Sequence, residues 1–428
     1  MLDSPVSSVN APITINASPN PLVVADSLDA MDEPLLTSKL KISNERSYFE
    51  FFFATLACFA CYASLFFFQD KVSKKCDIDH GNASLGFAIS LLSLGNLVFR
   101  LGHNLFFAFL KPRGRLFLAM TVMAIVEGLL FSIFYFADKM YVWQVGVIYG
   151  LGGVGIGTFE ANILNTTSAY GKKAKSMSVL AIPFGIASIT VISKPIMKWF
   201  GWIWPTYMYA YVGSLQVIGV LLLVLRVPAK SLARQGTSSR HFFLYISEWR
   251  QWFPVVFPWA MTFGFNMMSV SMFSPGIELY VFNDTDFPTV PVNVFNLVTF
   301  TIPNHYYFSL FSFLFMIGDS SSRKIFQKSK FKHPYSFLIF TIPGIIFGLS
   351  KVPGLVLATA FLVSFGNGGI YVSSSKAIDS KLDSKYNGIA YSVWLFLADG
   401  FSFSAFILTQ YVRDWLVPPV ENFFGLFI

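Results

Sequence analysis

The stretch LFLAMTVMAIVEGLLFSIFYFA, from Leu116 to Ala137, decides the fold class, because Glu127 is its one charged residue. An α-helix of about 20 residues rises about 30 Å, the thickness of the hydrocarbon core of a bilayer. In lipid, backbone polar groups can be satisfied only in a helix or a closed β-barrel. A barrel would show short alternating segments instead of one long apolar run. We therefore expect this stretch to be a transmembrane helix.

Apolar runs of the same kind recur from Ser47 almost to the C-terminus. The composition agrees, because 54% of the residues are hydrophobic and 13% are charged, against about 25% charged residues in soluble domains. The sequence predicts an all-α polytopic membrane protein of eleven spans, at 47–69, 84–109, 116–137, 141–164, 176–197, 203–226, 252–274, 304–322, 334–350, 353–374 and 388–411.

The rest of the chain divides around these spans. Residues 1–46 are rich in Ser, Pro, Asn and Asp without apolar periodicity, which predicts a disordered cytoplasmic tail. Residues 227–251 predict a cytoplasmic linker between an N-terminal lobe of six helices, 47–226, and a C-terminal lobe of five, 252–428. This division resembles two lobes around a central cavity.

The basic residues fix the expected orientation. The formal charge of +8 comes mainly from short loops, so it indicates topology and not nucleic-acid binding. Basic residues concentrate in alternate connections, near 111–115, 172–175, 226–250, 323–332 and 376–385. We expect these loops and the N-terminus in the cytoplasm and the C-terminus outside or in a lumen, in the plasma membrane or an endolysosomal membrane. The sequons at Asn82 and Asn283 then lie outside, where they could be glycosylated.

Charged residues within the spans are the candidates for function. A charge at the centre of a bilayer costs at least about 2.5 kcal/mol on insertion scales, so each needs a partner or a water-filled path. The alternative is a charge near a span end that reaches headgroup water, which fits Glu127 least and Arg323 best. The residues are Arg100, Glu127, Glu160, Asp319, Arg323 and Asp399.

Two of these positions carry specific hypotheses. Asp319 and Arg323 are four residues apart, so a helix places them on one face as an ion pair beside a solute path. Alternatively they merely end the span. Glu160 follows the glycine series of 150–157, which lets a helix or a solute approach closely. Its span has no basic residue to neutralise it, so we expect Glu160 to contact a solute or to carry a proton.

The sequence shows no enzyme site. The histidines are scattered, and Cys58 and Cys61 lie within the first span without a second ligand pair. Cys76 is expected in a loop, so no disulfide framework can form. We expect no catalytic residue, no metal and no cofactor.

The layout and several motifs resemble the equilibrative nucleoside transporters. That family carries Asp-x-x-Gly-Arg in its eighth span, matched in spacing by Asp319 and Arg323, and Asn-Gly in its tenth, matched by Asn367 and Gly368. The segment 272–276 is similar to the end of its seventh span. Ser322 departs from the family's glycine, Glu160 stands where many members have glutamine, and the Pro-Trp-Asn of the first span is absent.

The resemblance implies a major-facilitator-like fold of two lobes and a carrier of nucleosides or nucleobases that works by alternating access, facilitative or proton-assisted. It implies substrate-binding or gating roles for Glu160, Asn367, Asp319, Arg323 and Asp399. Residues 369–372 with Asp399 also resemble battenin-like lysosomal proteins, and 101–102 with 112–113 resemble amino-acid facilitators. A membrane scaffold or receptor that transports nothing stays open as a third class.

Overall fold

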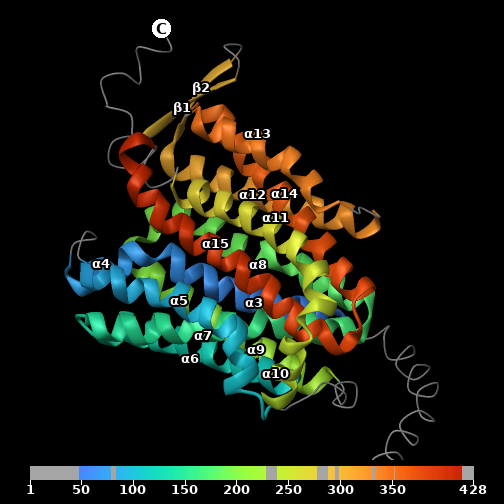
Figure 1. Cartoon of the computed structure of the whole chain (residues 1–428). Coiled ribbons are helices and arrows are strands. Elements are labelled where there is room, and N and C mark those ends of the chain that lie inside the picture. The colour runs from blue at the N-terminus through green and yellow to red at the C-terminus, as the bar shows by residue number, and fades with distance from the viewer. Residues whose placement is uncertain are drawn as a thin grey trace, which may run out of the picture. The chain divides into compact units, whose positions relative to one another are not determined.

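The structure is a computed structural model that describes residues 48–78, 83–227, 239–276, 288–294, 298–329, 333–350 and 352–416. Residues 47–428 form one compact unit. The predicted tail, both sequons and the C-terminal end of the chain lie outside the described residues. The unit is built almost entirely from helices (Figure 1).

The helices of the first half follow the predicted spans closely. They are α3 (Tyr48–Phe67), α4 (Gln69–Cys76), α5 (Ala83–Phe106), α6 (Pro112–Phe136), α7 (Val142–Tyr170), α8 (Lys172–Phe200) and, after the short η1 (Gly201–Ile203), α9 (Trp204–Arg226). Proline in the first turn suits α6 and α9, because the first turn lacks a backbone acceptor for an N–H group. Gly171 separates α7 from α8 with a φ of 101°, a conformation that favours glycine.

The second half is also mainly helical. Its elements are α10 (Ser239–Ser247), α11 (Trp249–Gly276), β1 (Thr289–Val294), β2 (Val298–Pro303), α12 (Asn304–Lys328), η4 (Pro334–Phe337), α13 (Leu338–Leu349), α14 (Pro353–Lys381), η5 (Ser384–Tyr386) and α15 (Asn387–Leu416). β1 and β2 pair antiparallel, with Thr289 opposite Pro303, in a connection where the sequence had predicted no element.

Each of the eleven predicted spans coincides with a helix. Within the described ranges, eight helices are long and apolar enough to cross a membrane: α3, α5, α6, α7, α8, α9, α11 and α14. α12 is more polar, because four of its last ten residues are charged, and α13 has only 12 residues. α11 begins three residues before the predicted span, and α12 and α14 extend beyond theirs.

One prediction about this part of the chain is wrong. Cys76 was expected in a loop, but it ends α4 and is buried. Val72 and Cys76 are four residues apart, so a helix puts them on one face, and both join the main hydrophobic core. Burying that face favours a helix where the sequence, with its three lysines, indicated only a polar loop.

The helices pack as two sets, and only a few helices of one set contact helices of the other. In the first set, α3 and α5 to α9, α5 packs on α7, α3 on α8, and α6 on both α7 and α9. In the second set, α11 to α15, α12 and α13 pack on α14, and α11 packs on α15. The main contacts between the sets are α5 with α15 and α8 with α12. We call the boundary between the two sets the seam.

The glycine series serves close packing of α7 on α5. A Cβ atom at Gly153 would lie 2.4 Å from the backbone oxygen of Leu92, and one at Gly157 would lie 2.6 Å from that of Asn96. Real Cβ atoms do not approach so closely, so only glycine allows this contact. The consequence for the site is that the Glu160 turn of α7 lies directly beside α5.

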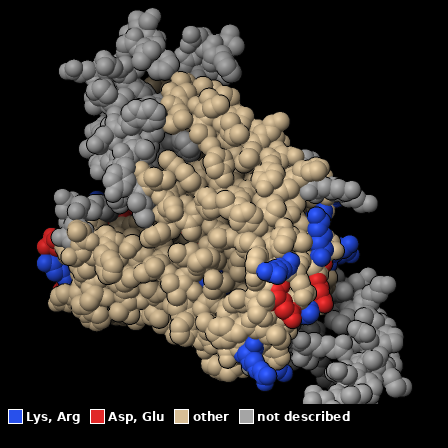
Figure 2. All heavy atoms as spheres, in the orientation of Figure 1, with Lys and Arg blue, Asp and Glu red and all other residues tan. Residues whose placement is uncertain are grey.

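On the face drawn in Figure 2, charged side chains lie toward the ends of the helices. Figure 2 shows one group of Lys, Arg, Asp and Glu over the region of α10 and a smaller group near α4. The broad face between them carries almost none. An uncharged face with charged side chains at both ends is what a bilayer requires of a membrane-spanning unit. We call the end with Lys172, Lys376 and Lys385 the basic end.

Candidate functional site

The centre of the seam contains a buried guanidinium between two carboxylates. Arg100 on α5 donates from Nη2 to Glu160 Oε2 on α7 and from Nε to Asp399 Oδ2 on α15, each at 2.5 Å. Asn96, one turn earlier on α5, also donates to Asp399 Oδ2 at 3.2 Å. The side chains of Arg100 and Glu160 are 4% and 7% exposed, and that of Asp399 is 15% exposed. Arg100 and Asp399 form a link across the seam.

This arrangement corrects the expectation for Glu160. We had expected no basic partner, because α7 carries none, but the partner comes from α5. The close approach of α7 to α5 brings the two residues together. Arg100 was noticeable in the sequence as an isolated cation within a predicted span, and that signal could have marked it as a site residue.

Tyr371 on α14 connects Glu160 to the second set of helices. Its hydroxyl donates to Glu160 Oε1 at 2.7 Å, again across the seam. The guanidinium carbon of Arg323 lies 4.4 Å from the centre of the Tyr371 ring, a cation–π contact. Trp394 packs edge-on against the same ring at 5.0 Å. Tyr371 lies in the stretch 369–372 that resembles battenin-like proteins, but the sequence did not mark it as a site residue.

Asp319 and Arg323 form the predicted ion pair. Arg323 donates from Nε and Nη2 to the two oxygens of Asp319, at 2.9 and 3.0 Å, and from Nη1 to the backbone oxygen of Val179 on α8 at 2.9 Å. Both side chains are at most 3% exposed. The alternative reading, in which Arg323 reaches headgroup water at a span end, is therefore wrong: α12 continues beyond it, and α8 covers it.

Asn367 lies in a chain of amides beside this pair. Its Oδ1 accepts from Asn266 Nδ2 on α11 at 3.2 Å, and Asn266 Oδ1 accepts from the Thr341 hydroxyl on α13 at 2.6 Å. The neighbouring Gly368 leaves room for α12, because a Cβ there would lie 2.4 Å from Asp319 Oδ1. Asn266 and Thr341 were missed; an asparagine within an apolar run was the available signal.

The five predicted site residues thus fall into two adjoining groups. Glu160 and Asp399 share Arg100, whereas Asp319, Arg323 and Asn367 lie together around α12 and α14. Tyr371 joins the groups, because it touches both Glu160 and Arg323. We call the whole the central cluster. It contains three carboxylates and two guanidinium groups, so with all of them ionised its net charge is −1.

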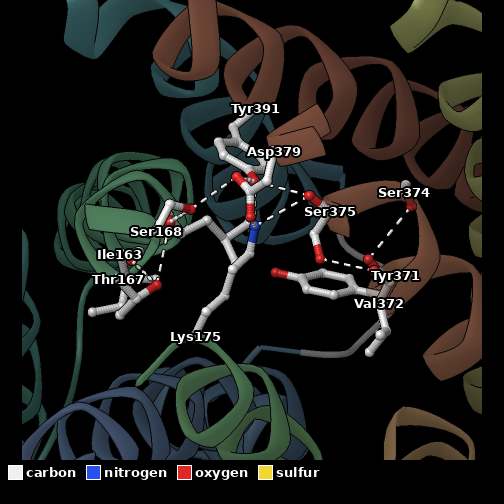
Figure 3. A network of polar contacts seen from close by, with 11 residues as sticks. Ile163, Thr167, Ser168, Lys175, Tyr371, Val372, Ser374, Ser375, Asp379 and Tyr391 are labelled. Carbon is white, nitrogen blue, oxygen red and sulfur yellow. Dashed lines mark hydrogen bonds and ion pairs between the residues drawn. The ribbon is translucent and has the colours of Figure 1, made fainter. Parts of the chain in front are cut away.

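A second polar cluster lies on the seam at the basic end. In Figure 3, Lys175 of α8 reaches between Asp379 of α14 and Tyr391 of α15, and its Nζ contacts both side chains. Ser168 of α7 donates to Asp379 Oδ1 at 3.0 Å, and the Tyr391 hydroxyl donates to the same oxygen at 2.5 Å. Lys175 also donates to the backbone oxygen of Ser375 at 3.2 Å. We call these five residues the basic-end lock, because they join both sets of helices.

The hydrogen bonds and ion pairs across the seam follow one another from its centre toward the basic end. From Arg100–Asp399 they continue through Asn104–Ser392 at 3.0 Å to the basic-end lock. The contact of Gln327 with the backbone oxygen of Ser176, at 3.3 Å, lies at the same end. These links therefore hold the seam closed from its middle to the basic end.

Glu127, the sixth charged residue predicted within the spans, lies away from the seam. It is fully buried in the first set, where Ser64 donates to its Oε1 at 2.6 Å. Its Oε2 has no hydrogen-bond partner among the described residues. Glu127 is thus a buried carboxylate in the same fold without a cationic partner, and it serves as a natural comparison for Glu160 and Asp399.

Two further features bear on ligands. A groove of about 690 Å³ lies between α5 and α7 near Phe87, Leu91 and Trp143, but its lining is mainly apolar and offers little to a polar solute. Within the described ranges no group of three or more His, Cys, Asp or Glu side chains could hold a metal ion. The central cluster therefore remains the candidate site.

Comparison with known proteins shows the fold. The chain matches the crystal structure of FucP, a Major Facilitator Superfamily transporter in the outward conformation, with a TM-score of 0.53 and 12% sequence identity. The match covers 87% of this chain and 100% of that one. No protein-family model matches the chain, and no curated protein matches it significantly. The chain is an all-α, multi-pass membrane protein with a major-facilitator-like fold.

Proposed function

We propose that this protein carries a small polar solute across a membrane by alternating access. The observation that carries the proposal is the central cluster: charged and amide side chains from both sets of helices meet on the seam, buried at the depth where such charges are costly. Transporters of this fold bind solutes near the bilayer midplane and rock two lobes around that site. We take 47–226 and 252–428 as those lobes.

The basic-end lock supplies one of the two gates in this proposal. Lys175 on α8 contacts Asp379 and Tyr391 of the other lobe, so these links must break before the basic end can open. The likeness to a transporter in the outward conformation agrees with a seam held closed at its basic end. We propose that this end faces the cytoplasm.

We propose a nucleoside or a nucleobase as the solute. Carboxylate, guanidinium and amide groups, such as Asp319, Arg323 and Asn367, offer both acceptors and donors for sugar hydroxyls and base edges. Tyr371 and Trp394 add aromatic surface beside them. The resemblance of this region to the nucleoside transporters supports the same choice. Movement could be facilitative or proton-assisted.

A basic amino acid is the second candidate. The central cluster has one more carboxylate than guanidinium groups, and a side-chain ammonium or guanidinium group on the solute would balance that charge. This charge imbalance favours a cationic amino acid over a neutral solute that moves without a proton.

Uptake by the purified protein in lipid vesicles tests these proposals. Labelled adenosine, adenine, lysine and leucine should be offered separately, with Glu160→Gln as the site variant and Glu127→Gln as the matched buried-carboxylate control. We expect adenosine or adenine to enter, Glu160→Gln to change affinity or rate, and Glu127→Gln to behave as wild type. Lysine uptake alone would favour the second candidate. If the protein in the vesicles is folded and none of the four solutes enters, the result would favour a scaffold or a receptor.

A further inference from the structure

The charge imbalance of the central cluster is confined to three residues. Arg323 is neutralised by Asp319 through two hydrogen bonds, so that pair needs nothing further. Arg100 is shared by Glu160 and Asp399, and arginine keeps its proton in proteins. With both carboxylates ionised, the Arg100 group therefore carries one uncompensated negative charge at bilayer depth. Such a charge is unfavourable unless a cation binds there.

We propose that Asp399 binds one proton and that the protein couples solute movement to this proton. The inference rests on the proposed transport function and names its coupling ion. A proton fits better than a metal cation, because the carboxylate oxygens of the group already accept short hydrogen bonds from Arg100 and Tyr371. Those donors occupy three of the four carboxylate oxygens, so a metal would find one free oxygen there, whereas a proton needs only one.

The contacts point to Asp399 as the carboxylate that is protonated. Both oxygens of Glu160 accept hydrogen bonds, one from Arg100 and one from Tyr371. Asp399 accepts from Arg100 and Asn96 on Oδ2 alone, and no described residue donates to its Oδ1. The Asp399 side chain is also 15% exposed, against 7% for Glu160. Asp399 thus has one oxygen without a donor among the described residues, and its side chain is the more exposed of the two.

Proton binding at Asp399 would loosen the seam. A proton from water forms an O–H bond with Oδ1, no other covalent bond changes, and Arg100 stays ionised beside Glu160. The neutral Asp399 attracts Arg100 much less than the carboxylate did. Because Arg100 belongs to α5 and Asp399 to α15, protonation weakens a link between the lobes. The same event thus neutralises the cluster and favours separation of the two lobes.

Other titratable groups near the cluster must be separated from Asp399. Tyr62 on α3 and Tyr371 on α14 are phenols, and Cys58 on α3 is a fully buried thiol. His103, on α5 like Arg100, is a buried imidazole whose Nδ1 lies 3.0 Å from the backbone oxygen of Phe99. α10 and α11 carry their charged or imidazole side chains only toward the basic end, at Arg240, His241 and Arg250.

The first experiment needs no solute. Spin labels at Lys173→Cys on α8 and Lys381→Cys on α14, both exposed at the basic end, report the distance between the lobes. Cys58, Cys61 and Cys76 are replaced by alanine in this background. In lipid nanodiscs between about pH 5.5 and about pH 8, we expect acid to increase the longer-distance population of the wild type.

The variants give distinct expectations in that experiment. Asp399→Asn mimics the neutral state, so it should show the longer distances at every pH. Glu160→Gln leaves Arg100 and Asp399 as a balanced pair, so the transition should move to lower pH. Glu127→Gln and His103→Gln should respond as wild type. A wild type insensitive to pH, a normal response of Asp399→Asn, or a lost response of His103→Gln would each overturn the proposal.

The second experiment measures coupling in vesicles with adenosine as the probe. A carrier that moves one proton with each neutral solute reaches about tenfold accumulation for each unit of pH gradient. Asp399→Asn should lose this accumulation but keep exchange of labelled for unlabelled adenosine, whereas Glu127→Gln keeps both. If lysine accumulates in response to the membrane potential and not to the pH gradient, the solute itself supplies the positive charge, and the proposal of a coupled proton is overturned.

The two experiments fail separately. If adenosine does not enter but the label distances respond to pH through Asp399, the nucleoside proposal is wrong and the proton site stands. If adenosine enters without any effect of a pH gradient and the distances ignore pH, the proton site is wrong and nucleoside transport stands.

Discussion

Removal of either member of the Asp319–Arg323 pair should destabilise the protein by about 3 to 5 kcal/mol, the cost of leaving a buried charge without its partner. The upper part of that range is expected, because Arg323 is 1% exposed and both oxygens of Asp319 accept from it. Asp319→Ala leaves a guanidinium with one remaining acceptor, the backbone oxygen of Val179. Arg323→Ala leaves a buried carboxylate beside Asn367.

The double variant should be less damaged than the sum of the two single variants, because it leaves no unpaired charge. We expect a coupling energy of about 2 kcal/mol or more from a double-mutant cycle. Unfolding of the purified protein in detergent gives the stability, and uptake at matched expression gives a second cycle. The charge swap of Asp319→Arg with Arg323→Asp should recover part of the lost function. Additive effects, with a coupling energy within about 0.5 kcal/mol of zero, would refute the reasoning.

Three further predictions follow from the packing, the lock and the topology. Gly153→Ala should destabilise the protein by about 1 to 3 kcal/mol in a thermal unfolding assay and impair uptake, because its Cβ would lie 2.4 Å from a backbone oxygen of α5. Gly150→Ala is the control, because its Cβ would lie 4.0 Å from the nearest atom, and it should have a small effect in the same assay. Asp379→Asn should lengthen the distance between spin labels at Lys173→Cys and Lys381→Cys, because the basic-end lock loses its carboxylate. The control Asp383→Asn changes an exposed residue outside the lock and should leave the distance unchanged; equal effects of the two variants would contradict the lock. In intact cells with the protein in the plasma membrane, antibody should reach a tag at the C-terminus but not one at the N-terminus, and the reverse pattern would overturn the assigned orientation.

The fold was predictable because its main signal is local. Most of the spans are apolar runs long enough to cross a bilayer, and lipid leaves a helix as the way to satisfy their backbone. The features that the sequence did not predict depend on contacts between segments that are distant in sequence or on connections between the spans. Cys76 is helical because Val72 and Cys76 join a core that the local sequence does not reveal. The hairpin of β1 and β2 lies in a connection without an apolar signal for a span.

The candidate site was predictable only where its partners are neighbours in sequence. Asp319 and Arg323 are four residues apart, so helical geometry alone pairs them. Glu160 and Arg100 are separated by 60 positions, and their pairing depends on the glycine contact between α7 and α5. Tyr371 is one tyrosine among 18, and its role appears only when α14 is placed against α7.

Uptake of labelled adenosine by vesicles that hold the purified protein tests the central claim most directly, when wild type, Glu160→Gln, Asp399→Asn and Glu127→Gln are compared. If the seam is the solute path, the wild type takes up adenosine, and both seam variants change its rate or its response to a pH gradient. Glu127→Gln, a carboxylate buried away from the seam, then behaves as wild type. Uptake that is unchanged in both seam variants, or lost only in Glu127→Gln, would contradict the account.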